Sequence, residues 1–447
     1  MRIEKLYLNE IGPFEKLLLE FPECGNKDKA EVHIFTGQNG VGKSTILYAL
    51  ASALSYGDYL NISKRFKNNN SSYCEVLFEN DEVIIFSLRS DYQNSRLLNN
   101  CPTKIVYNYL NKYKYTTESK EIVGNYIKTY LNYRPYAGNF IFNFAAFAYS
   151  GNRTITSHKL NSIQEINENP FNGSLSFTSS DDSTMFFQWL ANTKTKEALA
   201  NNQNDQLRAD KFRGSIDKIE KAIKKITDLD VKFKLEYEPL ALKLIIGEKI
   251  LNFDVLPDGL KSIISWIGDL SMRMDLINWE DNNIAIFERN FILFLDEIDI
   301  HLHPKWQRKI LPAVQELFPN AQIFVSTHSP FVVGSVSDAK VYTFEMVDNK
   351  SILKSVEDSK AGHSYSSVLE DTFNIKDPFD TETEDTFKEF YRILEIMQDK
   401  KNIISDEDNI KFVELANKLI SKGTEVKDIV GSELRQLARI TGREIEL

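Results

Sequence analysis

The chain has 447 residues, of which 42% are hydrophobic and 26% are charged. This balance is typical of a globular protein with two or three domains, or with one large domain that carries insertions. The formal net charge of −10 argues against a protein that coats nucleic acid through its overall field. No apolar run approaches a length of about twenty residues, and residues 1–5 lack the apolar core of a secretory signal. The widely spaced Cys24, Cys74 and Cys101 favour a reducing cytoplasm over a disulfide framework or a zinc site.

Two basic clusters are candidates for a local nucleic-acid groove. They are the run Lys64-Arg65-Phe66-Lys67 and the group Arg208, Lys211 and Arg213. We interpret the first as a solvated loop and the second as a solvated helix face, because charge runs of this kind usually face water.

The first half of the chain has the pattern of strands around one glycine-rich loop. Residues 2–9 and 16–21 resemble strands of a β-rich opening lobe, with a turn at residues 12–14. A buried helix is expected from Lys43 onward. Further strands are expected at residues 32–36, 74–78, 83–88 and 140–149.

The second half alternates helices and strands before a helical tail. Helical patterns cover residues 182–227 and 259–276 and a segment from Pro304. The expected strands are 231–237, 240–246, 249–255, 291–295, 322–326 and 341–344. Beyond these the chain is expected to be helical to its end, with apolar residues at helical spacing in 384–397, 410–420 and 426–440.

Strands that alternate with helices around a glycine-rich loop predict an α/β fold with a parallel core sheet. We expect four segments along this fold. They are 1–181 with the glycine loop, a helical insertion at 182–230, the second part of the same domain at 231–350, and a helical C-terminal extension at 351–447.

The segment Gly37–Ser44, Gly-Gln-Asn-Gly-Val-Gly-Lys-Ser, fits the pattern G-x-x-x-x-G-K-[ST] at every position. Glycines let such a loop turn successive N–H groups inward as a nest for phosphate oxygens, and the helix that follows adds its positive end. Lys43 would place its ammonium on the β- and γ-phosphates, and Ser44 would offer its hydroxyl to Mg²⁺. The sequence therefore predicts an ATP and Mg²⁺ site. Its predicted nucleotide-binding residues are Gly37, Asn39, Gly40, Val41, Gly42, Lys43, Ser44 and Thr45.

Phe291–Leu295 is an uninterrupted apolar run that ends in Asp296 and Glu297. Such a run suits a central strand of a parallel sheet, so the two acids should lie at its carboxyl edge, where these sheets bind ligands. Asp296 is predicted to hold Mg²⁺ through water, and Glu297 to polarise the attacking water as general base.

His328 follows a second apolar strand, Gln322–Ser326, that should lie beside the strand of Asp296. In that position a donor to the γ-phosphate is useful. We therefore predict Lys43, Glu297 and His328 as the catalytic residues.

The order of these motifs resembles the ABC-type ATPases of the RecF and SMC group. The resemblance rests on the opening Ile3–Phe14, the phosphate loop, Asp296-Glu297, the stretch His301–Gln307 and Thr327-His328. It implies an ABC-type nucleotide-binding domain with an antiparallel β-lobe, a short helical insertion and a helical C-terminal extension. It also implies dimers or higher oligomers that form through the ATPase domains. More narrowly, residues 296–307 resemble ATPases of antiviral defence operons, among them the Septu-type ATPases that act with a separate HNH nuclease.

In that family a signature motif from a second subunit closes over the nucleotide. The best match is Leu256–Ser262, which opens a helix and places Gly259 as a nucleotide-binding residue. Pro257 replaces the serine that would donate to the γ-phosphate, and Asp258 replaces a glycine. A carboxylate near a triphosphate is repulsive unless metal or lysine offsets it, so we expect altered nucleotide sandwiching and slow hydrolysis. For the family's Q-loop, Gln164 and the segment 149–153 are alternatives.

Features that the chain lacks narrow the function further. The insertion is too short for an SMC arm and has no zinc-hook cysteines. The residues after His328 show no Toprim-like acidic strand ends and no HNH cluster, so no nuclease site of its own is expected. The amphipathic C-terminal helices fit a core extension and a docking platform for a partner equally well.

We therefore favour a cytoplasmic ATP-dependent switch in antiphage defence. It would form dimers or larger oligomers and control a nuclease of HNH type encoded nearby, with DNA contacted through the complex and no membrane involved. A RecF-type repair ATPase that binds DNA directly is the alternative, and the acidic balance counts mildly against it. The ATPase subunit of a transporter is disfavoured by the opening strand pair, the altered signature and the acidic tail.

Overall fold

The structure is a computed structural model. It divides into two compact units, Met1–Val368 and Leu369–Leu447. It describes residues 1–25, 28–55, 62–68, 70–87, 97, 103–108, 114–116, 122–130, 133, 140–156, 160–177, 183–281, 283–359, 361–373, 379–398 and 406–441. Cys101 and residues 88 and 182, which belong to the sequence-based expectations, lie outside these ranges. Within the described ranges, no helix combines the length and apolar character needed to cross a bilayer.

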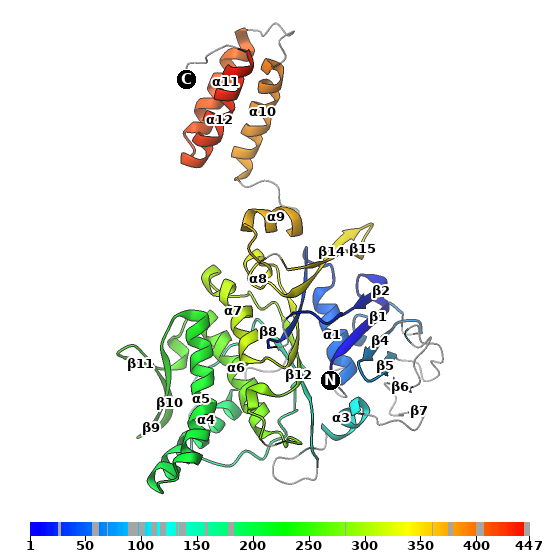
Figure 1. The fold of residues 1–447 in the computed structure, drawn as a ribbon, viewed down its shortest axis with the longest axis vertical. Coiled ribbons are helices and arrows are strands. Elements are labelled where there is room, and N and C mark those ends of the chain that lie inside the picture. The colour runs from blue at the N-terminus through cyan, green and yellow to red at the C-terminus, as the bar shows by residue number, and fades with distance from the viewer. Residues whose placement is uncertain are drawn as a thin grey trace. The chain divides into compact units, whose positions relative to one another are not determined.

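The first unit is built on a six-stranded core sheet in the order β15-β14-β3-β13-β12-β8 (Figure 1). β8, β12, β13, β3 and β14 run parallel to one another, and β15 pairs antiparallel with β14 at one edge. The central strands are apolar and buried, as expected for a parallel sheet covered on both faces. The α/β fold class is thereby confirmed. The bounds are β3 Glu31–Gly37, β8 Ala145–Ser150, β12 Phe291–Asp296, β13 Ala321–Ser326, β14 Ala339–Val347 and β15 Lys350–Asp358.

The edge strand β15 corrects the expectation of helix after residue 344. β14 and β15 form a hairpin in which Val347 pairs with Lys350, and the two loop residues Asp348 and Asn349 have φ of 50° and 62°. Two positive φ values are what a two-residue hairpin turn requires, and Asp and Asn tolerate them. This turn therefore begins a further strand where the sequence analysis expected helix.

A second six-stranded sheet forms the opening lobe, in the order β2-β1-β4-β5-β6-β7. It is antiparallel except between β5 and β6. Helix α1 (Lys43–Leu54) contacts strands of both sheets and buries one side against each (Figure 1). The predicted opening strands and the hairpin after residue 73 are confirmed. The bounds are β1 Ile3–Ile11, β2 Phe14–Glu20, β4 Tyr73–Phe78, β5 Glu82–Ser87, β6 Thr103–Asn108 and β7 Lys114–Thr116, and the lobe is followed by α3 Ile122–Tyr130.

The helical insertion is the hairpin of α4 (Thr184–Asn202) and α5 (Gln206–Thr227), with Asp205 capping α5. A three-stranded sheet follows, and both lie on the other side of the core sheet from the opening lobe (Figure 1). Its strands are β9 Val231–Tyr237, β10 Leu240–Ile246 and β11 Lys249–Leu251.

Two expected strands are shorter than predicted. The strand expected at 249–255 ends at Leu251, because Phe253 turns inward against the ring of Phe187 at 4.7 Å and residues 253–255 form a 3-10 turn. The strand expected at 140–149 begins only at Ala145, and Ile141 before it is exposed. Apolar content alone did not distinguish a ladder residue from a core-filling one.

Of the other helices described in the first unit, α6 (Asp258–Leu276) follows the three-stranded sheet. The helices α7 Pro304–Leu317, α8 Pro330–Val333 and α9 Tyr365–Phe373 follow the core strands β12, β13 and β15, and α9 continues across the boundary between the units. His303 accepts a hydrogen bond from the Lys305 amide at the start of α7, and Pro304 occupies its first turn.

The second unit contains α10 (Thr381–Gln398), α11 (Asp406–Ile420) and α12 (Thr424–Thr441). Their apolar stripes pack on one another around a core of their own. At its centre the rings of Phe390 and Phe412 stack at 4.8 Å. The apolar faces predicted from the amphipathic pattern are therefore mostly buried within this unit.

Candidate functional site

The phosphate loop connects β3 to α1 at the carboxyl edge of the core sheet. Gly37 and Gly42 adopt φ of 139° and 93°. A Cβ on Gly37 would lie 2.3 Å from the Phe344 carbonyl oxygen, and one on Gly42 would lie 2.5 Å from the Phe14 ring. Both positions therefore require glycine for backbone conformation and for close packing. Residues 38–40 at the tip of the loop are exposed, so the loop packs on the protein at its two ends while its tip faces solvent.

Lys43, Ser44 and Asp296 lie together where the pattern predicted them. Lys43 Nζ donates to the carbonyls of Gly37 and Gln38 at 3.0 Å each. Burial lowers the pKa of Lys43 to about 8, against the opposing influence of Glu297 and Asp296. Ser44 Oγ donates to Asp296 Oδ1 at 2.9 Å, so the hydroxyl and the carboxylate predicted to share Mg²⁺ are neighbours.

Asp296 and Ser326 end adjacent parallel strands, β12 and β13. Ser326 Oγ donates to Asp296 Oδ1 at 2.5 Å and accepts from the Glu297 amide at 2.8 Å. Burial raises the pKa of Asp296, although the hydrogen bonds from Ser326 and Ser44 oppose the rise. The serine was not singled out in the sequence. Its place at the end of the strand beside Asp296 is the signal that would have found it.

Glu297 has a φ of 53°, in the left-handed region that non-glycine residues rarely occupy. The loop after β8 reaches this turn, since Gly151 N donates to the Asp296 carbonyl at 2.7 Å. Burial raises the pKa of Glu297, and the carboxylates of Asp296 and Asp299 raise it further. A strained turn held from a second segment is typical of a residue whose position matters for chemistry.

His328 follows β13, beside the strand of Asp296 as expected. It is half-buried, and its ring makes no hydrogen bond with any described residue. Burial lowers the pKa of His328, and the cation of Lys43 adds to the effect. A neutral imidazole with a free N–H suits a donor to a developing negative charge.

The side chain of Gln307 holds the segment after Glu297 in place through hydrogen bonds. Its amide donates to the carbonyls of Asp299 and Leu302 at 3.1 and 2.9 Å, and its oxygen accepts from Ser329 Oγ at 2.7 Å. Thr327 Oγ1 donates to the Asp299 carboxylate at 2.6 Å. The stretch His301–Gln307 therefore fixes one loop to the strand end that carries His328.

The predicted signature motif opens α6, with Pro257 immediately before the helix. A Cβ on Gly259 would lie 2.5 Å from the His301 carbonyl oxygen, so this glycine packs on the loop after Glu297. Asp258 is exposed, and Lys261 lies 3.4 Å from its carboxylate. This lysine is the kind of offset that a carboxylate in a nucleotide-facing motif needs.

The loop after β8, and not Gln164, meets the site. Ser262 Oγ donates to the Gly151 carbonyl at 3.2 Å, which ties the signature helix to the loop that contacts Asp296. Arg153 lies 3.6 Å from the partly buried Asp269 of α6. Gln164 bonds to Ser162 and is exposed. Among the alternatives for the Q-loop position, segment 149–153 is the one that the fold brings to the site.

Two residues that support the phosphate loop were missed in the sequence. Ser351 on β15 donates to the Val41 carbonyl at 2.7 Å. Arg65 donates to Thr45 Oγ1 at 2.8 Å, and its guanidinium lies 4.4 Å from the centroid of the Tyr48 ring. The interpretation of run 64–67 as a solvated loop is therefore wrong for Arg65, which is half-buried against α1.

The second basic cluster does lie on an exposed helix face. Arg208 on α5 pairs with Asp205, and Arg213 on the same helix pairs with Glu197 and Asp210. Acids of α4 and α5 thus pair with both arginines, and the expected solvated helix face is confirmed.

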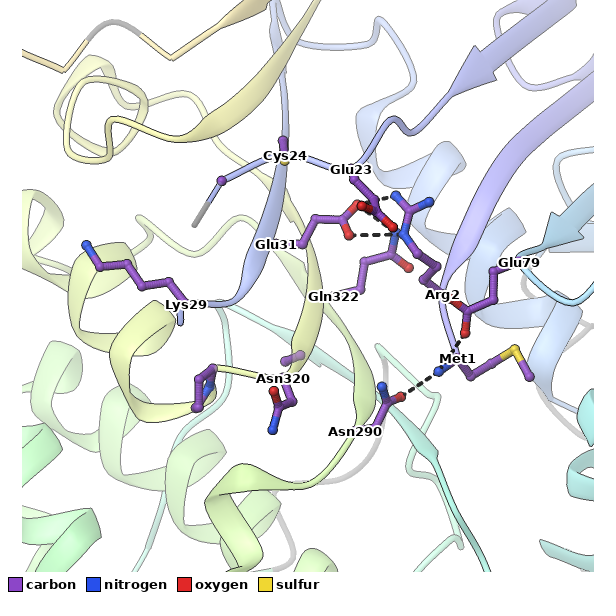
Figure 2. Close-up of a pocket in the computed structure, with 13 residues that line it drawn as sticks. Met1, Arg2, Glu23, Cys24, Lys29, Glu31, Glu79, Asn290, Asn320 and Gln322 are labelled. Atoms are coloured by element: carbon purple, nitrogen blue, oxygen red, sulfur yellow. Dashed lines mark hydrogen bonds and ion pairs between the residues drawn. The ribbon is translucent and has the colours of Figure 1, made fainter. Parts of the chain in front are cut away.

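A separate polar cluster lies at the amino ends of β3 and β13, at the opposite edge of the core sheet from the phosphate loop. Figure 2 shows Cys24 and Glu31 of this cluster, with Arg2 and Gln322 beside Glu31. The donor atoms of Cys24, Glu31 and His33 lie within 4.8 Å of one another, a spacing compatible with a metal ion. However, Glu31 Oε1 already accepts from Arg2 at 2.6 Å, from Gln322 at 3.1 Å and from His33 at 2.6 Å. Although burial opposes it, the hydrogen bonds from His33 and Arg2 hold the pKa of Glu31 below its usual range. This cluster joins β1 to the core sheet.

The donor set at the carboxyl edge fits Mg²⁺. A serine hydroxyl and a carboxylate are hard oxygen ligands of the type that Mg²⁺ takes beside substrate phosphates. Ser44 and Asp296, already in contact, would hold the ion, which would neutralise charge on the phosphates.

A glycine nest at the start of a helix, a hydroxyl–carboxylate pair, an acid in a strained turn and a strand-end histidine together define an ATPase of the ABC-type P-loop class. The chain belongs to the family described as "AAA domain, putative AbiEii toxin, Type IV TA system", whose sequence model matches residues 32–334.

The chain is also similar to curated proteins over most of its length. It is 24% identical to "Retron Ec83 probable ATPase" of Escherichia coli, over 91% of this chain and 81% of that protein. It is 24% identical to "Retron Vc95 probable ATPase" of Vibrio cholerae, over 83% of this chain and 78% of that protein. It is 21% identical to "Septu protein PtuA" of Bacillus thuringiensis, over 89% of this chain and 91% of that protein. Among solved structures it is similar to an SMC head bound to the C-terminal winged-helix domain of ScpA, with a TM-score of 0.44 and 14% identity, over 80% of this chain and 98% of that one.

Proposed function

We propose that this ATPase is a nucleotide-driven switch in antiphage defence that controls a separate nuclease of HNH type. The observation that carries the proposal is the similarity over most of the chain to proteins named as retron ATPases and as the Septu protein PtuA. The switch function is supported by a site assembled from many segments, because such a site responds to rearrangement of any of them.

The residues at the carboxyl edge have distinct roles in this proposal. Lys43 leaves the carbonyls of its own loop to hold the β- and γ-phosphates, while Ser44 and Asp296 orient the metal. Glu297, whose carboxylate makes no hydrogen bond with a described residue, accepts a proton from the attacking water. His328 donates to the γ-phosphate as its charge develops.

The signature helix acts on a second subunit in this proposal. Pro257 and Asp258 at the start of α6 are exposed and available to another copy, whereas Gly259 is buried against the His301 backbone of its own subunit. Two subunits would then close over nucleotide in a dimer or a larger oligomer. The chain with Glu297→Gln should bind ATP without hydrolysing it and should therefore accumulate as the closed oligomer, seen as a larger mass by light scattering.

The first test is a pull-down of the tagged chain, expressed with its neighbouring genes and read by mass spectrometry. A nuclease in stoichiometric amount is expected, and phage plating should show protection that Lys43→Ala and Glu297→Gln remove. Lys249→Ala is the matched control, since this lysine is exposed on the ATPase unit and makes no ion pair with a described residue. Recovery of a permease, or of no partner with tight salt-dependent DNA binding by the chain alone, would overturn the proposal.

The C-terminal unit is proposed as the dock for the nuclease. Its helices bury most of their apolar faces on one another, and a partner would meet an outer surface that is largely polar but also exposes Tyr391, Ile410 and Ile440. Removal of residues 369–447 should abolish co-purification of the nuclease while ATP hydrolysis continues. Co-purification that survives this deletion would place the dock on the ATPase unit.

A further inference from the structure

A cavity of about 360 Å³ opens between α5, the carboxyl end of α6 and the loop that leads to β12. One wall is apolar and aromatic, with Trp279, Ile284 and Phe287, and the other carries charged groups. None of its lining residues belongs to the phosphate loop or to the strand ends at Asp296 and His328. Its volume falls at the small end of the range of about 300–1,000 Å³ that ligand pockets span.

Arg289 supplies a buried positive charge to this cavity. The residue is 6% exposed, and its guanidinium lies 5.2 Å from the centroid of the Trp279 ring. Its Nη1 donates to the Asp281 carbonyl, while its Nε has no hydrogen-bond partner. Within the described ranges, no carboxylate forms an ion pair with Arg289, although the charge of Asp281 acts on it from farther away. A buried cation with so little counter-charge is costly, and a bound anion would reduce that cost.

Two lysines of α5 extend the positive wall. Lys211 and Lys218 line the cavity with Gly214 between them, at spacings of three and four residues that place all three on one helix face. Lys218 Nζ lies 5.2 Å from the centroid of the Phe287 ring. Three cationic side chains from two segments therefore converge on one space.

Gly214 keeps this space open. Glycine inside a helix is unfavourable, and here no close packing requires it, because a Cβ would meet nothing within 4 Å. A larger side chain at this position would project into the cavity instead. The open cavity beside Gly214, and not helix packing, therefore explains why a glycine stands at this position.

Asp275 offers an acceptor at the same cavity. One of its carboxylate oxygens, Oδ2, accepts from Trp189 Nε1 at 2.8 Å. Its other oxygen makes no hydrogen bond with a described residue. A ligand that satisfies both walls therefore has an anionic group, a hydroxyl or amino donor, and a flat or apolar body.

We propose that this cavity binds a small organic phosphate of mononucleotide size. Arg289, Lys211 and Lys218 hold the phosphate, Asp275 accepts from a hydroxyl or amino group, and the aromatic wall covers the body of the ligand. Because this cavity is separate from the phosphate loop, the ligand would act there as an effector and not as the substrate of hydrolysis.

The test uses AMP and inorganic phosphate as probes without Mg²⁺, measured by calorimetry and thermal shift on the full chain. Lys43→Ala is present in every sample so that the phosphate loop does not contribute. We expect AMP to bind at least tenfold more tightly than inorganic phosphate. Arg289→Met and Gly214→Leu should each weaken AMP at least tenfold, while Gly214→Ala should change binding less than Gly214→Leu.

Absence of AMP binding would overturn the proposal, as would equal binding to the Arg289→Met chain. Equal affinity for AMP and inorganic phosphate would overturn the assignment of an organic body and leave an anion site only. If Arg289→Met fails to fold, Gly214→Leu still tests the proposal, because it fills the cavity without changing the charge of its lining. None of these outcomes depends on the proposed role in defence.

Discussion

Gly151→Ala isolates the contact between the loop after β8 and the turn of Glu297. A Cβ at this position would lie 2.0 Å from the Glu297 carbonyl oxygen and 3.3 Å from Ile300. Non-bonded carbon and oxygen atoms need roughly 3 Å or more, so the Glu297 turn must move by about 1 Å. The loop cannot retreat freely, because Gly151 N donates to the Asp296 carbonyl at 2.7 Å. A misplacement of about 1 Å in a positioned catalytic group can cost about a hundredfold in rate.

We therefore expect Gly151→Ala to lower kcat for ATP hydrolysis by about a hundredfold with little change in ATP affinity. Phosphate release gives kcat, and a fluorescent ATP analogue gives the dissociation constant. Gly423→Ala serves as the control for a glycine-to-alanine change in open space. Hydrolysis at the wild-type rate, in a chain that folds normally, would show that Gly151 does not position Glu297.

Three further predictions concern the same site. Ser351→Ala removes the hydrogen bond to the Val41 carbonyl and should weaken ATP binding about tenfold, which corresponds to about 1–2 kcal/mol. Ser355→Ala on the same strand should leave ATP affinity unchanged, and equal affinities of the two variants would refute the prediction. The pH profile of kcat/KM should fall at low pH, where Glu297 with its raised pKa becomes protonated, and at high pH, where Lys43 with a pKa of about 8 loses its charge. Lys43→Arg should move the alkaline limb upward, and an unmoved limb would assign it to another group. Gln307→Ala removes the side-chain donor of the Leu302 carbonyl and leaves the Asp299 carbonyl with the Leu302 amide alone. It should cost about 1–3 kcal/mol of stability together with a fall in kcat, measured by denaturant unfolding and steady-state assay.

The sequence predicted the parts of the site that are contiguous. The phosphate loop and the pair Asp296-Glu297 each depend on one strand and the residues directly after it, so spacing and burial are enough to place them. His328 could be placed because parallel strands end at a common edge, and β12 and β13 do pair in parallel. These predictions needed only local pattern and the rules of parallel sheets.

The parts that were missed depend on contacts between distant segments. Ser351 reaches Val41 only because β15 forms a hairpin with β14, and the polar composition of the segment hid that strand. Arg65 reaches Thr45 because its loop folds back on α1. Neither contact has a spacing in the sequence that distinguishes it from an ordinary solvated serine or arginine, so tertiary packing decided both.

The same distributed construction explains how a site of this kind can act as a switch. The start of α6, where a second subunit is expected to bind, is joined to the catalytic turn by short connections. Ser262 Oγ bonds to the Gly151 carbonyl, and Gly151 N in turn bonds to the Asp296 carbonyl. Gly259 packs on the backbone of His301, in the loop that Gln307 fixes to the strand end of His328. In the proposed dimer, a shift of α6 on subunit closure would therefore reach Glu297 and His328 together, and hydrolysis would depend on assembly.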